Sequence, residues 1–149
     1  MNQTLVADPT AAGCRWVDIP GASDPRGTVT FCETGKSVDF PMRRVFWIHG
    51  VTVGQNRGHH AHRDCRLAIV AAAGAATLVL DDGRVRERVR LDRPNRGVLV
   101  ETWVWHELVD FAADSVILVM ASHNYDEADY IRDHDAFRRE VAERPAVSR

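Results

Sequence analysis

Short apolar runs, and short stretches in which apolar and polar residues alternate, recur along most of this chain and are separated by turn residues, as in buried and half-buried β-strands. Turn signals divide the runs, including a Pro- and Gly-containing cluster over 20–25 and an Asp-Asp-Gly hairpin turn over 81–83. Many short strands at regular spacing are typical of a β-sandwich or barrel. We predict strands over residues 14–19, 27–33, 44–49, 66–73, 75–80, 84–91, 98–104, 106–111 and 115–121.

The two ends of the chain depart from this pattern. Residues 1–13 are small and polar, which predicts a frayed lead-in without a strand. From Asp126 onward the apolar positions recur at helical spacing, and Pro145 ends the run. We therefore predict a C-terminal helix whose inward-facing residues are Tyr130, Phe137 and Val141.

Composition narrows the class of protein further. With 149 residues, 45% apolar and 27% charged, the chain is expected to form one domain spanning 1–149, with a core over about 14–137. The net charge of −2 argues against nucleic acid as a partner. No apolar stretch is long enough to cross a membrane, and no signal peptide is recognisable, so the cytoplasm is the expected location. Three cysteines without a C-x-x-C spacing predict neither disulfides nor a zinc site.

The most informative stretch is Gly54-Gln-Asn-Arg57-Gly-His59-His60-Ala-His62, which holds three of the seven histidines. His60 and His62 are two apart, so on a strand their imidazoles point to the same face. An apolar run over 67–73 follows directly, which places the histidines beside a buried region. A same-face histidine pair next to Arg57 favours a functional site over a histidine-rich surface loop.

A further histidine lies in Trp105-His106-Glu107, and a β-barrel could bring it against the pair His60 and His62. Three converging imidazoles suit either a metal site or acid–base chemistry. The spacing from Gly54 to His60-x-His62 matches the first motif of the cupin superfamily, which normally continues with a metal-binding glutamate. Arg66 stands at that glutamate position and would repel a divalent cation, so we expect acid–base chemistry and no metal.

Several segments together resemble a specific family, the small cupins of the dTDP-4-oxo-6-deoxyglucose 3,4-ketoisomerases (FdtA/QdtA-like, or WxcM-like). The resemblance covers about residues 24–137. Each segment alone is a weak signal, but the set is highly specific. The matching segments are Asp24-x-Arg26-Gly27, Arg44-Val45 with two aromatics and Ile48, Arg57-Gly58-x-His60-Ala61-His62-Arg63, Leu80-Asp81-Asp82-Gly83, Val104-Trp105-His106-Glu107, and Ala121-Ser122-x-x-Tyr125-Asp126-Glu127-x-Asp129-Tyr130-Ile131-Arg132.

The resemblance implies a cupin jelly-roll barrel, in a homodimer that exchanges N-terminal strands. It implies a dTDP-linked 4-keto sugar as substrate, with no metal or organic cofactor. It also implies proton transfer between C3 and C4 through an enediol. On the family pattern His60 is the main acid–base group, and His62 is a second proton carrier or orienter. The residues expected to hold the substrate are Arg26, Arg57, Arg44, His59 and His106.

The chain also departs from the family pattern near the expected site. Phe46 and Trp47 replace two tyrosines, the first of which is expected to partner the catalytic histidine. Arg66-Leu67 replaces a Glu-Gln pair. Three interpretations follow: a ketoisomerase in which His59, His49 or water replaces the phenol, an epimerase or isomerase acting on a related sugar nucleotide, or a binding protein without catalysis. The chain keeps the family's His-Ala-His motif and its arginines, which favours the ketoisomerase interpretation.

Overall fold

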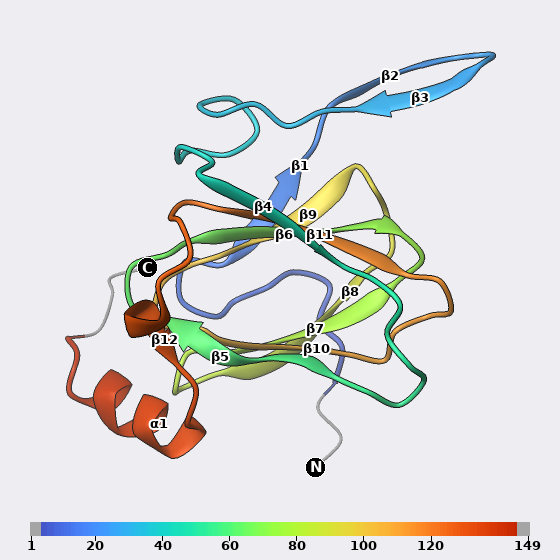
Figure 1. Cartoon of the computed structure of the whole chain (residues 1–149). Helices are drawn as coiled ribbons and strands as arrows, with labels where there is room; N and C mark the ends of the chain where they lie inside the picture. Colours follow the sequence, from blue (N-terminus) through green and yellow to red (C-terminus); the bar gives the residue numbers. More distant parts are fainter. Residues whose placement is uncertain (1–3, 146–149) are drawn as a thin grey trace.

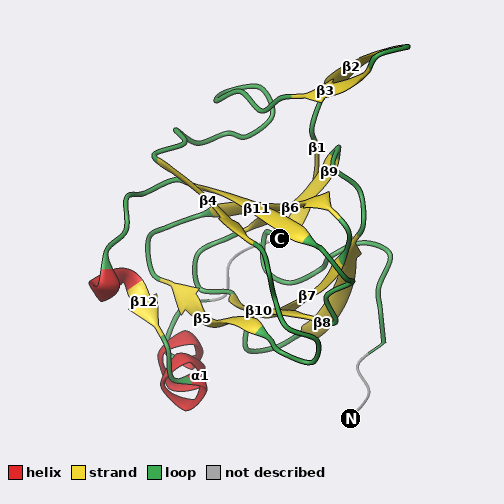
Figure 2. Cartoon of the chain, turned by 45° about the vertical axis from the view of Figure 1, so that its right-hand side comes forward, coloured by secondary structure: helices red, strands yellow, loops and turns green. Residues whose placement is uncertain are grey.

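The structure, a computed structural model, describes residues 4–145, and residues 1–3 and 146–149 lie outside the described part. Two five-stranded antiparallel sheets face each other (Figures 1 and 2). This arrangement confirms the prediction of an all-β jelly roll with a short C-terminal helix. In spatial order the first sheet contains β1 (Arg15–Asp18), β9 (Arg96–Val100), β6 (Leu67–Ala73), β11 (Val116–Ala121) and β4 (Arg44–Ile48), and the second contains β12 (Tyr130–Ile131), β5 (Arg57–His62), β10 (Trp105–Val109), β7 (Ala76–Asp81) and β8 (Arg86–Leu91).

The main core fills part of the space between the sheets, because alternate residues of each strand point inward. From the first sheet, β6 contributes Leu67 and Ile69 to this core, and from the second, β7 contributes Leu78 and Leu80. All four are at most 2% exposed. The core therefore ties the two sheets together, and Leu67 and Ile69 at its edge also line the cavity described below.

Helix α1 (His134–Ala142) covers the outer face of the second sheet (Figure 1). Its Phe137 is fully buried there, in a cluster with Trp105 and Ile131. The helix begins at the cap residue Asp133, whose carboxylate accepts the Ala136 N–H at 2.6 Å.

The prediction of a helix from Asp126 onward is wrong over its first part. Residues Glu127–Asp129 form a 3₁₀ turn, η1, and Tyr130–Ile131 form β12, which pairs with His62 and Ala61 of β5. The ladder bonds to β5 satisfy the backbone of this segment, so pairing overrides the helical spacing of its side chains. Tyr130 is therefore a strand residue and not a helical one.

The N-terminal lead-in is also more ordered than predicted. The backbone N–H groups of Thr10 and Ala11 donate to the buried carboxylate of Glu87, at 2.6 and 2.7 Å, and Ala11 is 1% exposed. Glu87 occupies an inward position on β8, a strand in which Arg86, Arg88 and Arg90 alternate with the inward residues. Its buried charge is matched by these N–H donors, so the lead-in and β8 stabilise one another.

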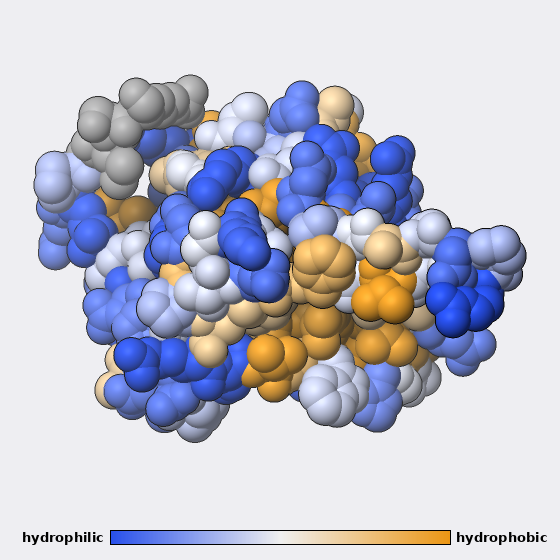
Figure 3. All heavy atoms as spheres, turned by 90° about the horizontal axis from the view of Figure 1, so that it is seen from above, coloured by the Kyte–Doolittle hydropathy of each residue, from blue (hydrophilic) through white to orange (hydrophobic). Residues whose placement is uncertain are grey.

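The predicted turn cluster over 20–25 is instead half of a β-hairpin. Strands β2 (Gly21–Asp24) and β3 (Gly27–Thr30) pair with each other and project away from the sheets (Figure 1). Val29 is 67% exposed and Phe31 is 44% exposed. Apolar side chains also gather on the face seen in Figure 3, the side of the hairpin and the first sheet. No helix among the described residues is long and apolar enough to cross a membrane.

Candidate active site between the sheets

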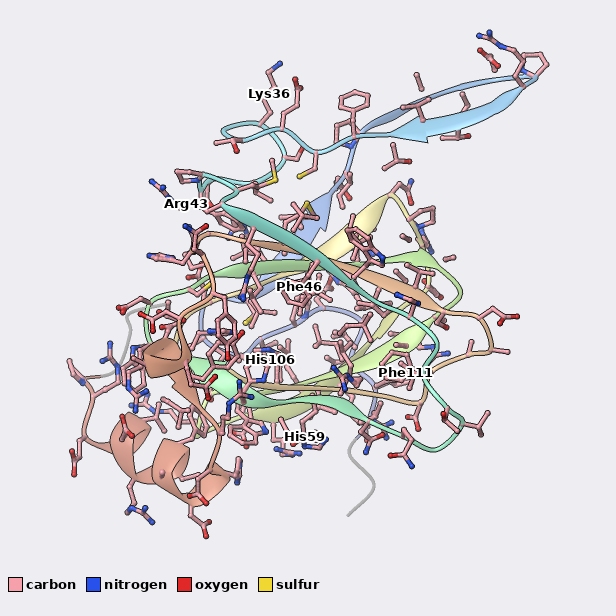
Figure 4. All side chains as sticks on the ribbon, viewed as in Figure 1. Lys36, Arg43, Phe46, His59, His106 and Phe111 are labelled. Atoms are coloured by element: carbon pink, nitrogen blue, oxygen red, sulfur yellow. The ribbon has the colours of Figure 1, made fainter. Side chains whose placement is uncertain are left out.

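A cavity of about 780 Å³ opens between the sheets where the apolar core stops. Its wall includes Phe46 of β4, Arg57 and His60 of β5, and His106 of β10. Figure 4 shows Phe46 and His106 lying between the two sheets. The volume falls in the range of small-molecule sites, which is roughly 300–1,000 Å³.

A β-bulge in β5 sets which side chains reach this cavity. His106 pairs with His60 and Glu107 with Gly58, so His59 is an extra residue without a partner on β10. Arg57 and His60 are three apart and would face opposite sides of a regular strand. Because the bulge adds one residue between them, Arg57 and His60 face the same side of the sheet, and both line the cavity.

The bulge in turn depends on glycine. Gly58 has φ 84°, in the left-handed region, and a Cβ at this position would lie 2.9 Å from the His106 carbonyl oxygen. His59 follows with φ 61°. The Arg-Gly-x-His-Ala-His order therefore has a backbone explanation, because only glycine allows β5 and β10 to approach closely at this point.

Three imidazoles meet at the cavity wall. The ring centroids of His60 and His106 are 4.5 Å apart, those of His60 and His62 are 4.9 Å apart, and those of His62 and His106 are 5.8 Å apart. His62 and His106 are each 3% exposed, and His62 lies behind His60 without lining the cavity. The predicted convergence of these histidines is therefore observed, with His60 as the member of the pair that reaches the cavity.

Burial keeps these imidazoles in their neutral form. Desolvation, together with the neighbouring His62, lowers the pKa of His60 to about 4. The Nδ1 atom of His60 is buried and makes no hydrogen bond within the described part of the chain. The pKa of His106 is lowered well below its usual value, first by complete burial and then by the other two histidines. A neutral imidazole is a proton acceptor at physiological pH.

His62 differs from the other two because it has a carboxylate partner. Its Nδ1 lies 2.7 Å from Oδ2 of Asp129 in the η1 turn. Burial lowers the pKa of His62, and the hydrogen bond and charge of Asp129 oppose that effect. Burial alone would raise the pKa of Asp129, but the hydrogen bonds from the Asp64 backbone N–H and from His62 outweigh it and lower the pKa.

Two further residues at the cavity were not among the predicted site residues. The ring of Tyr130 lies 4.8 Å from that of His60 and 4.4 Å from that of His62, and Arg44 donates to its hydroxyl at 3.4 Å. Arg132 also lines the cavity, and its guanidinium lies 4.3 Å from the Tyr130 ring centroid. The Tyr-Ile-Arg segment is part of the family resemblance, but the sequence interpretation placed Tyr130 on the inward face of a helix and gave Arg132 no role.

Three predicted substrate-binding residues do not point into the cavity: Arg44 is not part of its wall, and Arg26 and His59 face elsewhere. The Arg26 side chain is 90% exposed on the β2–β3 hairpin and pairs with Asp24 at 2.6 Å, and no residue of that hairpin lines the cavity. His59 borders the cavity through the bulge, but its imidazole faces the outer side of the second sheet (Figure 4). There its Nδ1 lies 3.8 Å from Oε1 of Glu107.

Arg66 does not face the histidines, contrary to the prediction. Its guanidinium pairs with Glu101 at 2.7 Å and with Asp39 at 3.0 Å, and it is not part of the cavity wall. The argument that its charge repels a metal is therefore wrong. His60, His62 and His106 each offer a nitrogen, and these atoms lie within 4.8 Å of one another, so they could converge on a divalent cation.

Comparison with known proteins agrees with the geometry. The FdtA family model, described as WxcM-like, C-terminal, matches residues 12–142. A TDP-4-oxo-6-deoxy-alpha-D-glucose-3,4-oxoisomerase from Aneurinibacillus thermoaerophilus is 39% identical over 119 residues, which is 80% of this chain and 86% of the relative.

Solved structures of similar proteins share the architecture. A 3,4-ketoisomerase from Helicobacter canadensis is 31% identical with a TM-score of 0.85, over 88% of this chain and 98% of its own. The sugar 3,4-ketoisomerase QdtA from Thermoanaerobacterium thermosaccharolyticum, solved in complex with TDP, is 28% identical with a TM-score of 0.87, over 90% of this chain and 98% of its own. The similarity therefore extends through both sheets and the cavity between them.

Proposed function

This chain belongs to the FdtA family, WxcM-like, C-terminal, and from that premise we propose that it is a dTDP-4-keto-6-deoxyhexose 3,4-ketoisomerase. One observation carries the proposal for the chemistry. His60 is a neutral imidazole, and it stands on the wall of a cavity large enough for a sugar nucleotide. Such a group can remove a proton next to a ketone.

The reaction needs only proton transfers. The C3 proton is acidic because C3 is adjacent to the C4 ketone, and His60 takes it. The electron pair of the C3–H bond forms a C3=C4 double bond, and the former carbonyl pair remains on O4, which is protonated to give an enediol. The imidazolium then returns a proton to C4 while the C3 hydroxyl loses its proton and becomes the new ketone. Electrons balance without an external oxidant or reductant.

The oxygens need a proton donor and acceptor as well. Tyr130 is the phenol in contact with His60, and Arg44 holds its hydroxyl. We assign Tyr130 to the proton relay between O3 and O4, in place of the tyrosine that Phe46 replaces. This assignment supersedes His59, whose imidazole lies on the outer side of the sheet.

Arg57 is the best-placed group for the pyrophosphate of the substrate. It lines the cavity, and its guanidinium makes no ion pair with the residues that the structure describes. Guanidinium groups match phosphate oxygens in charge and geometry. Arg44 is engaged with Tyr130, which favours a supporting role for it.

Deuterium exchange tests the function directly. In deuterated water with dTDP-4-keto-6-deoxyglucose, we expect a 3-keto product labelled at C4 and recovered substrate labelled at C3. A label at C5 instead would indicate an epimerase. Binding of dTDP without any exchange would indicate a protein that holds the nucleotide without catalysis. Because Phe46 departs from the family pattern, these two outcomes are the alternatives to distinguish.

A strand-exchanged homodimer is the proposed assembly. Hairpin β2–β3 leaves the body of its own chain and exposes Val29 and Phe31, while the edge strand β4 exposes Val45 and Trp47. A partner's hairpin packed near β4 would cover both apolar sets and would bring its Arg26 towards the cavity. In such a dimer Arg26 would reach the substrate in the partner's cavity, whereas in a single chain it lies away from its own cavity.

Subunit mixing tests that assembly. His60→Asn and Arg26→Ala chains should each have little activity, and refolding them together should restore about a quarter of the wild-type activity. Mixed dimers would contain one site with His60 from one chain and Arg26 from the other. If mixing restores nothing although light scattering shows dimers, Arg26 does not serve the partner's cavity.

We propose that catalysis needs no metal or organic cofactor, because the proton transfers are complete with the groups named above. The convergent histidines make a direct test necessary. Turnover should survive dialysis against a chelator, with metal analysis of the dialysed protein. Loss of turnover that returns on adding one divalent metal would contradict this part of the proposal.

A further inference from the structure

A buried carboxylate lies directly behind the histidine pair. Asp129 projects from the η1 turn, and its side chain is 10% exposed. One oxygen, Oδ2, lies 2.7 Å from Nδ1 of His62, and the other, Oδ1, accepts the backbone N–H of Asp64 at 2.6 Å. Both oxygens therefore have fixed partners, and the carboxylate cannot rotate away from His62 without losing a hydrogen bond.

This contact selects one tautomer of His62. The carboxylate accepts, so Nδ1 carries the proton and Nε2 of the neutral ring keeps a lone pair. The ring is also confined by its neighbours, because His60, His106 and Tyr130 contact it on several sides. A ring flip or a change of tautomer would break the Asp129 bond in a space closed to water.

The fixed tautomer matters for His60, which does the chemistry. A nitrogen of His60 and a nitrogen of His62 lie within 4.8 Å of one another. When His60 takes the substrate proton it becomes a cation among buried rings. A neighbour that presents a lone pair stabilises this cation, whereas a neighbour that presents an N–H group opposes it.

We propose that Asp129 is a positioning residue, which holds His62 as the Nδ1–H tautomer so that His62 supports proton uptake by His60. The inference rests on the proposed function, and it adds a residue that neither the family motif nor the fold assigns a role. Asp129 acts through His62 and does not touch the substrate. Its loss is therefore expected to reduce kcat and to leave nucleotide binding intact.

The test is Asp129→Asn, which keeps the size of the side chain and can keep the bond to the Asp64 N–H. An amide can donate to Nδ1 and so favour the opposite tautomer of His62. We expect kcat to fall about 100-fold while KM and the Kd for dTDP change by less than about threefold. Asp126→Asn is the matched control, because Asp126 caps the same turn through the Ala128 N–H at 3.0 Å and contacts none of the histidines in the described structure.

Nitrogen NMR of ¹⁵N-histidine-labelled protein reads the tautomer of His62 directly, and the split between kcat and KM separates a positioning role from a purely structural one. Wild-type His62 should show a protonated Nδ1, and the Asp129→Asn protein should lose that signal. A wild-type spectrum with the proton on Nε2 overturns the inference, and this measurement holds even if the variant does not fold. A kcat for Asp129→Asn within about threefold of Asp126→Asn also overturns it.

The two proposals fail in different ways. If the wild-type protein does not turn over the sugar nucleotide, the proposed function fails, and the NMR spectrum still tests the state of His62. If turnover is present and Asp129→Asn retains it, the ketoisomerase proposal stands and the role of Asp129 falls.

Discussion

The two faces of the second sheet place similar residues in opposite environments. On the inner face His60, His62 and His106 are packed against one another, and burial lowers their pKa values. On the outer face His59 lies near Glu107, whose carboxylate also accepts from Arg86 at 2.9 Å, so charges there are paired and partly solvated. His59 and His60 are adjacent in the chain and belong to different chemical settings.

The difference shows what makes a histidine useful for proton abstraction here. The inner imidazoles are largely buried and, except for His62, lack a carboxylate partner among the described residues, so the neutral form is favoured at physiological pH. The outer imidazole has water and a carboxylate within reach. The position relative to the sheet, rather than the residue type, separates a candidate base from a surface group.

The largest expected effect comes from replacing one of two adjacent histidines. His60→Asn should lower kcat about 1,000-fold, because general acid–base catalysis contributes roughly 10²–10⁴-fold. His59→Asn, the matched change on the outer face, should stay within about threefold of wild type. Steady-state assays with the sugar nucleotide, and dTDP binding by calorimetry, measure both variants. Equal losses from the two substitutions would remove the distinction between the faces.

The second-largest expected effect is a loss of folding stability in acid, caused by the buried histidines of the inner face. An unfolded histidine has a pKa of 6.5 and folded His60 one of about 4, so the unfolded chain binds more protons between these values. Stability conferred by the neutral ring is present above pH 6.5 and is lost as the pH falls towards 4. For His60 alone the loss is on the order of 3 kcal/mol.

Urea unfolding at about pH 7 and about pH 4.5 measures this loss, with His60→Asn as the comparison. The variant should lose less stability on acidification than the wild type. Identical losses in both proteins would show that other groups cause the acid sensitivity.

A smaller effect is expected at the cavity arginine. Arg57→Ala should weaken dTDP binding about 10- to 100-fold, because a charged hydrogen bond is worth roughly 1.5–3 kcal/mol. The free energy of unfolding should hardly change, since Arg57 has no ion pair to lose within the described residues. Calorimetric titration with dTDP measures the affinity, and Arg138→Ala on the exposed face of α1 is the control. An unchanged Kd would mean that the pyrophosphate is held elsewhere.

The smallest expected effect distinguishes two aromatic residues of the cavity. Tyr130→Phe should lower kcat about tenfold by removing the hydroxyl that Arg44 holds. Phe46→Tyr, which restores the family residue, should change kcat by less than about threefold if Tyr130 already supplies the phenol. A large gain in Phe46→Tyr, with no loss in Tyr130→Phe, would assign the phenol role to the position of residue 46.

Local patterns along the chain predicted the sheet strands well and the peripheral segments poorly. Short continuous apolar runs bounded by turn residues marked β6, β7 and β11, because such runs are typical of strands buried in a core. The lead-in and β2 carry weak alternation, so their bonds to distant residues or to β3 could not be read locally, although β3 itself lies within the predicted strand over 27–33. The segment around Tyr130 had helical spacing, but pairing with β5 decided its conformation.

The residues of the candidate site also fall into those that the sequence predicted correctly and those that it misplaced or missed. The residue types and the family motif pointed to His60, His62, His106 and Arg57 as site residues; the fold brings the three histidines together, and all but His62 line the cavity. The expectation that Arg66 would face the histidines was wrong, because Arg66 precedes β6 and its guanidinium pairs with Glu101 and Asp39. Asp129 was missed because its partner His62 is 67 residues away in the chain.

By itself the sequence determined the period-two strands, the all-β class and the chemical identity of the paired imidazoles, because these depend on residue type and spacing over a few positions. Only the tertiary structure decided which side chains share the cavity. A one-residue bulge at His59 reverses the face of Arg57, and β12 brings Tyr130 and Asp129 against the histidines. Such outcomes depend on hydrogen bonds between strands far apart in the chain, and no local pattern encodes them.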